Sequence, residues 1–144
     1  MRILVIDSNI VYAKRVKTAL ECFVHSIEVD LANDVFVTQR RLRTNKYDLI
    51  IVDIQTIANQ ELMLEELKNT SIPSIAWTAL PHLTYIEKQQ LGEKIKSIKK
   101  PLKFDDFEFQ EAAIAALTTA RAGSSSGFLP AIDKIDDANI DLIR

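Results

Sequence analysis

Two aspartates, a threonine and a lysine each stand close behind a short apolar run in this 144-residue chain. Asp7 follows RILVI, Asp53 follows DLIIV, Thr78 follows PSIAW, and Lys100 comes shortly after IKSI. Carboxylates bind hard metal ions, while an ammonium and a hydroxyl can hold an anion or stabilise developing negative charge. These groups form one site only if the elements that carry them bring the four side chains together.

The overall composition indicates an ordinary globular domain and excludes several classes of protein. The 18 basic and 20 acidic residues leave a net charge of -2, which does not favour a nucleic-acid surface. Cys22 is the only cysteine and is expected to be a small buried apolar group. His25 and His82 are far apart, which argues against a Cys/His metal site. No run approaches the roughly 20 apolar residues of a membrane span, and the cytosol is the expected compartment.

Short runs rich in β-branched residues alternate with helical patterns along the chain. The expected strands are residues 2–6, 26–31, 48–52, 73–77 and 95–98. Strands separated by helices pair in parallel through right-handed crossovers, so that helices cover both faces of the sheet. The pattern therefore predicts an α/β fold with a doubly wound, five-stranded parallel sheet of the flavodoxin-like (βα)5 type. In such folds ligands bind at the carboxyl ends of the strands, which is where Asp7, Asp53, Thr78 and Lys100 stand.

Apolar residues spaced by three and four positions predict the helices between these strands. The first stripe is Ile10, Ala13, Val16, Leu20 and Phe23, and a later one is Met63, Leu64 and Leu67. We expect Asn33 to cap the second helix and Asn59 the third. A last helix is expected over residues 103–120, with Phe104, Phe107, Ile114 and Leu117 on one face.

The composition changes after the last helical pattern. Residues 1–121 form the predicted domain, and residues 122–127 (AGSSSG) are typical of a flexible linker. Residues 128–144 are an acidic segment with scattered apolar residues, and their pattern stops in what looks like the middle of a helix. We expect the chain to belong to a longer protein.

Three features follow one another along the chain: Asp53 directly after an expected buried strand, then Thr78 followed by Ala79, then Lys100 followed by Pro101. Together with the segments around them, these features resemble the response-regulator receiver domain of two-component signalling. The segments are MRILVIDSN, YDLIIVDI, IPSIAWTAL and SIKKPLKFDDF. The resemblance covers residues 1 to about 120 and implies the strand order 2-1-3-4-5.

The resemblance implies a role for each of the candidate residues. Asp53 corresponds to the aspartate that accepts a phosphoryl group, Thr78 to the hydroxyl that holds a phosphoryl oxygen, and Lys100 to the ammonium that pairs with it. Mg²⁺ would be held by Asp7, Asp53 and the backbone carbonyl of Gln55, because a hard divalent ion takes several oxygen ligands. An added phosphoryl group needs such cations to offset its charge.

The resemblance also implies partners. A sensor histidine kinase would supply the phosphoryl group, and a C-terminal effector domain of a longer parent protein would be regulated, with transcription control as the expected output. A homodimer could form through the fourth helix, the fifth strand and the fifth helix. We expect a phosphorylated signal-transduction domain of the cytoplasm, not a turnover enzyme, and one that contacts neither membrane nor nucleic acid directly.

Three positions depart from the family pattern. Ser8 stands where a second acid usually follows Asp7, so weaker Mg²⁺ binding is expected. The loop after Asp53, QTIANQ, is short and lacks the usual glycines, and Ser97 replaces an aromatic residue that usually precedes the lysine by three positions. These departures favour an alternative: a pseudo-receiver that acts as a dimerisation or docking module without phosphorylation.

Other interpretations of single residues stay open at this stage. Asp7 could cap the helix that begins near Asn9, and Trp77 is expected to pack in the core rather than stack on a ligand. The lysine-rich run 94–103 is expected to be a solvated edge strand. A flavodoxin-like enzyme or nucleotide binder would need a phosphate loop rich in Gly, Ser and Thr after the first strand, and SNIVYAK is not one.

Overall fold

The computed structural model describes residues 1–79, 95–104 and 107–122. Its centre is one parallel sheet of five strands in the order β2-β1-β3-β4-β5, as predicted. The strands are β1 (Arg2–Ile6), β2 (Glu28–Ala32), β3 (Leu49–Val52), β4 (Ser74–Thr78) and β5 (Lys96–Lys99). The sequence placed β1 correctly and the other strands to within one or two residues.

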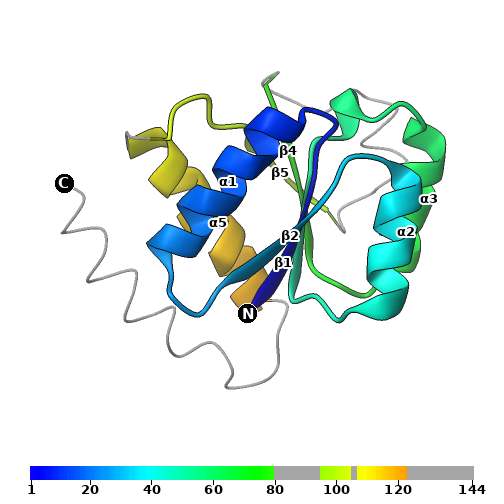
Figure 1. Ribbon diagram of the computed structural model, residues 1–144, viewed down its shortest axis with the longest axis horizontal. Coiled ribbons are helices and arrows are strands. Elements are labelled where there is room, and N and C mark those ends of the chain that lie inside the picture. Colours follow the sequence, from blue (N-terminus) through cyan, green and yellow to red (C-terminus); the bar gives the residue numbers. More distant parts are fainter. Residues whose placement is uncertain (80–94, 105–106, 123–144) are drawn as a thin grey trace.

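Helices cover both faces of this sheet (Figure 1). They are α1 (Ile10–Phe23), α2 (Val35–Thr44), α3 (Gln60–Asn69) and α5 (Phe107–Ala122), with a short 3₁₀ helix, η1 (Ile54–Thr56), directly after β3. The helices α1 and α5 pack on one face, and α2 and α3 pack on the other. The expected fourth helix, residues 123–127 of the expected linker and residues 128–144 lie outside the described residues, whereas Ala122, expected to begin the linker, is the last residue of α5.

The strand β3 shows why both sides of the sheet need apolar residues. Leu49 and Ile51 belong to the core under α1 and α5, whereas Ile50 and Val52 belong to the core under α2 and α3. All four side chains have an exposed fraction of 0%. Burial of each contributes about 1.5–3 kcal/mol, so the strand that precedes Asp53 is held firmly from both faces.

Helix caps differ in part from the prediction. Asp34, not Asn33, caps α2, because its carboxylate accepts a hydrogen bond from the Val37 N–H at 2.8 Å. Asn59 does stand at the start of α3, although the described part of the chain shows no cap hydrogen bond from its side chain. Asn9 caps α1 by accepting from the Tyr12 N–H at 3.1 Å. Asp7 is therefore not the cap of that helix.

Three predictions about packing and one about a helix boundary were wrong. Cys22 is exposed, because it lies on the outer side of α1 next to the buried stripe. Ile10 is 46% exposed at the first position of α1, beyond the edge of the core. The last helix begins at Phe107, not at residue 103, and Phe107 is itself 46% exposed. Small side chains with Phe109 and Leu117 make its buried face: Ala112, Ala113, Ala116 and Ala120.

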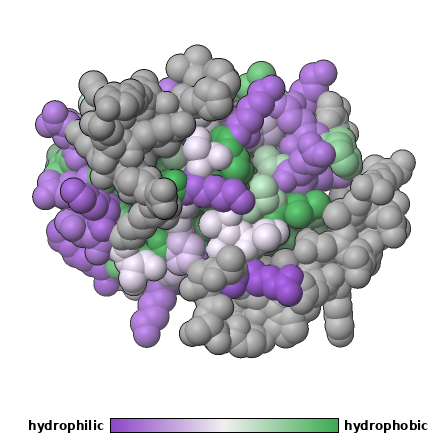
Figure 2. All heavy atoms as spheres, turned by 180° about the vertical axis from the view of Figure 1, so that it is seen from behind, coloured by the Kyte–Doolittle hydropathy of each residue, from purple (hydrophilic) through white to green (hydrophobic). Residues whose placement is uncertain are grey.

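One face of the molecule carries both polar and apolar side chains among the described residues. Figure 2 shows hydrophilic side chains spread over one face, with hydrophobic residues forming small areas between them. His25 is exposed in the loop after α1, while Trp77 is buried in the core, as expected. Lys96 and Lys99 of β5 are exposed, which agrees with a solvated edge strand. Among the described residues we find no helix with both the length and the apolar character that a membrane span requires.

Candidate functional site

The structure brings the side chains of Asp7, Asp53 and Lys100 together at the carboxyl edge of the sheet. The Lys100 Nζ atom lies 2.7 Å from Oδ2 of Asp7 and 2.7 Å from Oδ2 of Asp53. The two acids are neighbours because Ile6 and Val52, the residues before them, are paired across β1 and β3. Lys100 follows β5, and its long side chain reaches past β4 to the acids. The backbone N–H of Lys100 donates to the Thr78 carbonyl at 2.8 Å, which fixes the Lys100 backbone beside the end of β4.

These three charged residues are buried. Asp7 is 1% exposed, Asp53 3% and Lys100 7%, so one buried ammonium faces two buried carboxylates. Burial raises the pKa of Asp53 above its ordinary value, although the hydrogen bond and charge of Lys100 oppose this. Burial would lower the pKa of Lys100, but the hydrogen bonds from its ammonium to Asp53 and Asp7 outweigh this and raise the pKa. The lysine therefore stays charged at neutral pH.

Thr78 lies next to this group and contacts Gln55. The Thr78 hydroxyl donates to the side-chain Oε1 atom of Gln55, and the Gln55 N–H donates to Oδ1 of Asp53 at 3.2 Å. Gln55 belongs to η1, a single turn that begins directly after Asp53. The threonine hydroxyl is thus linked to Asp53 through Gln55.

Thr56 is a member of the site that the sequence did not single out. Its Oγ1 atom accepts a hydrogen bond from the Ser8 N–H at 3.1 Å and lies 3.0 Å from the Asp53 carbonyl and 3.4 Å from Oδ1 of Asp7. The available signal was a hydroxyl three residues after the acid, a common turn arrangement. Thr56 ties the loop after β1 to the loop after β3, so it helps to hold the two acids at a fixed separation.

Tyr12 is a second member that the sequence did not reveal. The Lys100 Nζ atom lies 4.1 Å from the centre of the Tyr12 ring, which is a cation–π geometry. The Tyr12 hydroxyl donates to the Pro101 carbonyl. Burial raises the pKa of Tyr12, and the nearby charges of Asp7 and Asp53 raise it further, so the hydroxyl stays protonated.

The donor set can be compared with what a hard cation needs. Among residues 1–79, 95–104 and 107–122, no three His, Cys, Asp or Glu side chains gather into a group that could hold a metal ion. Asp7 and Asp53 do offer carboxylate oxygens, and they carry one more negative charge than Lys100 offsets. Ser8, beside them, is exposed and contributes no charge. A hard divalent cation takes several oxygen ligands, so these two carboxylates supply only part of such a site.

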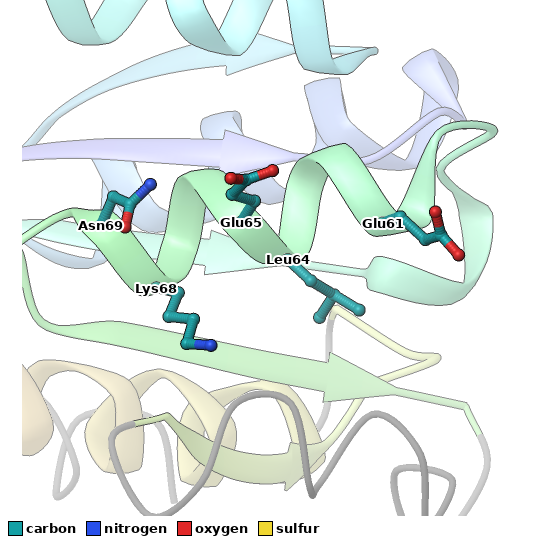
Figure 3. A pocket seen from close by; sticks show the side chains of 5 residues that line it. All are labelled: Glu61, Leu64, Glu65, Lys68 and Asn69. Carbon is teal, nitrogen blue, oxygen red and sulfur yellow. The ribbon is translucent and has the colours of Figure 1, made fainter.

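A hollow elsewhere on the surface does not share these properties. It has a volume of about 390 Å³ and is lined by Glu61, Leu64, Glu65, Lys68 and Asn69. Figure 3 shows that all five side chains project from α3. None of them belongs to the group around Lys100, and the mixture of charges favours no particular ligand. The acid pair therefore stays the candidate site.

Comparisons with known proteins rest on structure alone, since no family model and no curated protein matches the chain. A two-component response regulator from Clostridium difficile matches with a TM-score of 0.67 and 22% identity, over 88% of this chain and 99% of that one. The receiver domain of the Francisella response regulator 1452 matches with a TM-score of 0.64 and 21% identity, over 85% and 98% of the two chains.

A third match was solved with a ligand. The response regulator protein TrrA from Thermotoga maritima, in complex with Mg²⁺ and BeF, matches with a TM-score of 0.57 and 23% identity, over 77% of this chain and 96% of that one. At these identities the similarity concerns the fold. The resemblance noted in the sequence is confirmed at that level: the chain has the receiver-domain fold of response regulators.

Proposed function

We propose that this chain is a receiver-type regulatory domain in which Asp53 accepts a phosphoryl group from a sensor histidine kinase. The observation that carries the proposal is the Lys100 ammonium, which lies 2.7 Å from the Asp53 carboxylate at the carboxyl edge of a receiver fold. An anionic nucleophile can approach an anionic phosphoryl group only where positive charge is already in place. The domain is regulatory and does not turn over a substrate.

Five residues of the site have a part in this reaction. A carboxylate oxygen of Asp53 forms the new bond to phosphorus as the bond between phosphorus and the kinase histidine breaks. Lys100 then pairs with a phosphoryl oxygen, and the Thr78 hydroxyl leaves the Gln55 side chain to donate to another. When bound, Mg²⁺ neutralises charge on the phosphoryl oxygens, and Asp7, Asp53 and the Gln55 carbonyl would hold it.

The proposal extends to partners by the same resemblance. The phosphorylated domain would regulate a C-terminal effector domain of a longer parent protein in the cytoplasm, with transcription control as the output. A homodimer would use β5, α5 and the segment between β4 and β5, which lies outside the described residues.

A second candidate is a pseudo-receiver that docks or dimerises without phosphorylation. Two observations favour it: Asp53 is only 3% exposed, and Ser8 supplies no second acid beside Asp7. With Asp53 buried to this extent, a phosphoryl donor can reach its carboxylate only after neighbouring groups have moved. The two candidates differ in whether Asp53 reacts.

Intact-mass measurement separates them. The domain is incubated with Mg²⁺ and acetyl phosphate, and one phosphoryl group is expected, stable in acid and labile in base. Asp53→Asn should abolish it, because an amide is a far poorer nucleophile. Asp34→Asn is the matched control, since asparagine also caps helices well and α2 should keep its cap. A folded wild-type domain that gains no phosphoryl group supports the pseudo-receiver instead.

A further inference from the structure

Tyr12 contacts both the Lys100 side chain and the backbone of the next residue, Pro101. Its ring lies 4.1 Å from the Lys100 ammonium, and its hydroxyl donates to the carbonyl of Pro101, the next residue along the chain. A lysine side chain has many rotamers and a strongly hydrated head group. Contact at both the head group and the adjoining backbone removes much of that freedom.

The same ring also packs against other aromatic residues. The ring of Tyr12 lies 5.2 Å from the Phe104 ring, and Phe104 lies 5.2 Å from Phe109 of α5. The Arg15 guanidinium stands 4.7 Å above the Phe104 ring. Tyr12 also meets Trp77 edge to face, with ring centres 6.4 Å apart. Aromatic pairs at these distances have preferred geometries, so movement of one ring changes the packing of the next.

Phe104 connects the packed aromatic residues Tyr12, Trp77 and Phe109 to the surface. With Arg15, Thr18, Cys22 and other residues of α1 it lines a hollow of about 350 Å³. A displacement that begins at Lys100 can therefore reach an exposed face of α1 through two side chains, Tyr12 and Phe104.

We infer that Tyr12 is a positioning residue that holds the Lys100 ammonium over the acid pair and transmits its displacement through Phe104 to the α1 face. This rests on the proposed function, in which an anion on Asp53 draws Lys100 away from its present place. The movement weakens the contact between the ammonium and the ring, and the ring then repacks against Phe104.

The first experiment tests the positioning without any anion. The ¹⁵N signal of the Lys100 ammonium should be resolved in the wild type, because the group is buried and ion-paired. Tyr12→Phe keeps the ring and should keep the signal, whereas Tyr12→Leu should broaden it beyond detection. Tyr47→Phe is the control, since its hydroxyl contacts Asp30 instead. An unchanged signal in a folded Tyr12→Leu variant would overturn the positioning role.

The second experiment tests transmission with beryllofluoride and Mg²⁺ as the phosphoryl mimic. Trp77 is the only tryptophan and Cys22 the only cysteine. Intrinsic fluorescence therefore reports on the contact of Trp77 with Tyr12, and a dye on Cys22 reports on the hollow that Phe104 lines on α1. Both signals should change on binding in the wild type. In Phe104→Leu the Trp77 response and the Lys100 signal should persist while the Cys22 response is lost. A Cys22 response that persists in Phe104→Leu and in Tyr12→Leu would overturn transmission.

Binding itself is followed by ¹⁹F spectra, which separates two kinds of failure. If beryllofluoride does not bind the wild type, the proposed phosphoryl site is wrong, and the Lys100 signal alone then decides the positioning role. If it binds and neither reporter changes, transmission by Tyr12 is wrong while the phosphoryl site stands.

Discussion

The ammonium nitrogen of Lys100 lies 2.7 Å from the Oδ2 atom of Asp53, and both side chains are buried. Lys100→Met keeps most of the apolar stem but leaves two buried carboxylates without a counter-charge. We expect it to lower the free energy of unfolding by about 3–5 kcal/mol, measured by urea denaturation. Lys99→Met, at the exposed neighbouring position of β5, should change stability by less than about 0.5 kcal/mol. Equal effects of the two substitutions would contradict the importance of the buried ion pairs.

Asp53→Asn should act in the opposite direction. The single ammonium of Lys100 faces two carboxylates, and burial raises the pKa of Asp53. The negative charge of Asp53 therefore lowers the stability of the folded state. Removing that charge should raise the free energy of unfolding at pH 7, because burial disfavours the charged form of this side chain. Chemical denaturation of the two proteins at pH 7 provides the measurement. A loss of stability would show that Asp53 contributes more through its hydrogen bonds than it costs through its charge.

Ser8→Asp should strengthen Mg²⁺ binding. Ser8 is exposed beside Asp7, where a carboxylate adds negative charge and an oxygen ligand. Calorimetric titration should show weak binding in the wild type and about tenfold tighter binding in the variant, because affinity follows the number of charged ligands. Ser8→Asn adds an oxygen without charge and serves as the control. Tight binding by the wild type, unchanged in Ser8→Asp, would mean that another oxygen ligand already completes the site.

Glu21 should contribute to stability in a pH-dependent way. Burial acts to raise the pKa of Glu21, but hydrogen bonds from the Val29 N–H and from Lys17, both at 3.0 Å, outweigh it and lower the pKa. A lowered pKa in the folded state gives stability that is present above the unfolded value of about 4.3 and is lost as the pH falls through the folded value.

The substitution Glu21→Gln should therefore cost stability at pH 7 and cost progressively less below about pH 4. The loss at pH 7 should stay below about 1 kcal/mol, since the group is partly exposed. Thermal unfolding at a series of pH values measures the effect, with Glu28→Gln as an exposed control on β2. A difference that does not vary with pH would assign the effect of Glu21 to packing.

The strands could be predicted because buried parallel strands such as β3 need apolar side chains on both faces, and this leaves a clear run in the sequence. The acids and Lys100 followed from the positions where those runs end. The cap of α2 could not be decided, because Asn33 and Asp34 are adjacent and both types cap helices well. The expectation for Cys22 followed its residue type, whereas its position falls outside the buried stripe of α1, which is Ala13, Val16, Leu20 and Phe23.

The long-range contacts of Tyr12 and Thr56 could not be predicted from sequence for a different reason, although the turn contact of Thr56 with Asp53 had a local signal. Their contacts join residues that are distant along the chain: Tyr12 meets Lys100 and Pro101, and Thr56 meets Ser8 and Asp7. No local pattern records such contacts. They depend on how the loops at the carboxyl edge approach one another once the sheet has formed.

The order of the strands has a consequence for folding. Positions 7, 53 and 100 meet only after β1 has paired with β3 and β5 has joined β4, and each of these pairings closes a long crossover. Loop-closure entropy must be overcome before any of those contacts stabilises the chain, so the acid pair and its ammonium assemble late. Partly folded chains and fragments that lack β5 would carry no ion pair at this edge. A ligand of the site would then bind only completely folded molecules and, by mass action, protect them from unfolding.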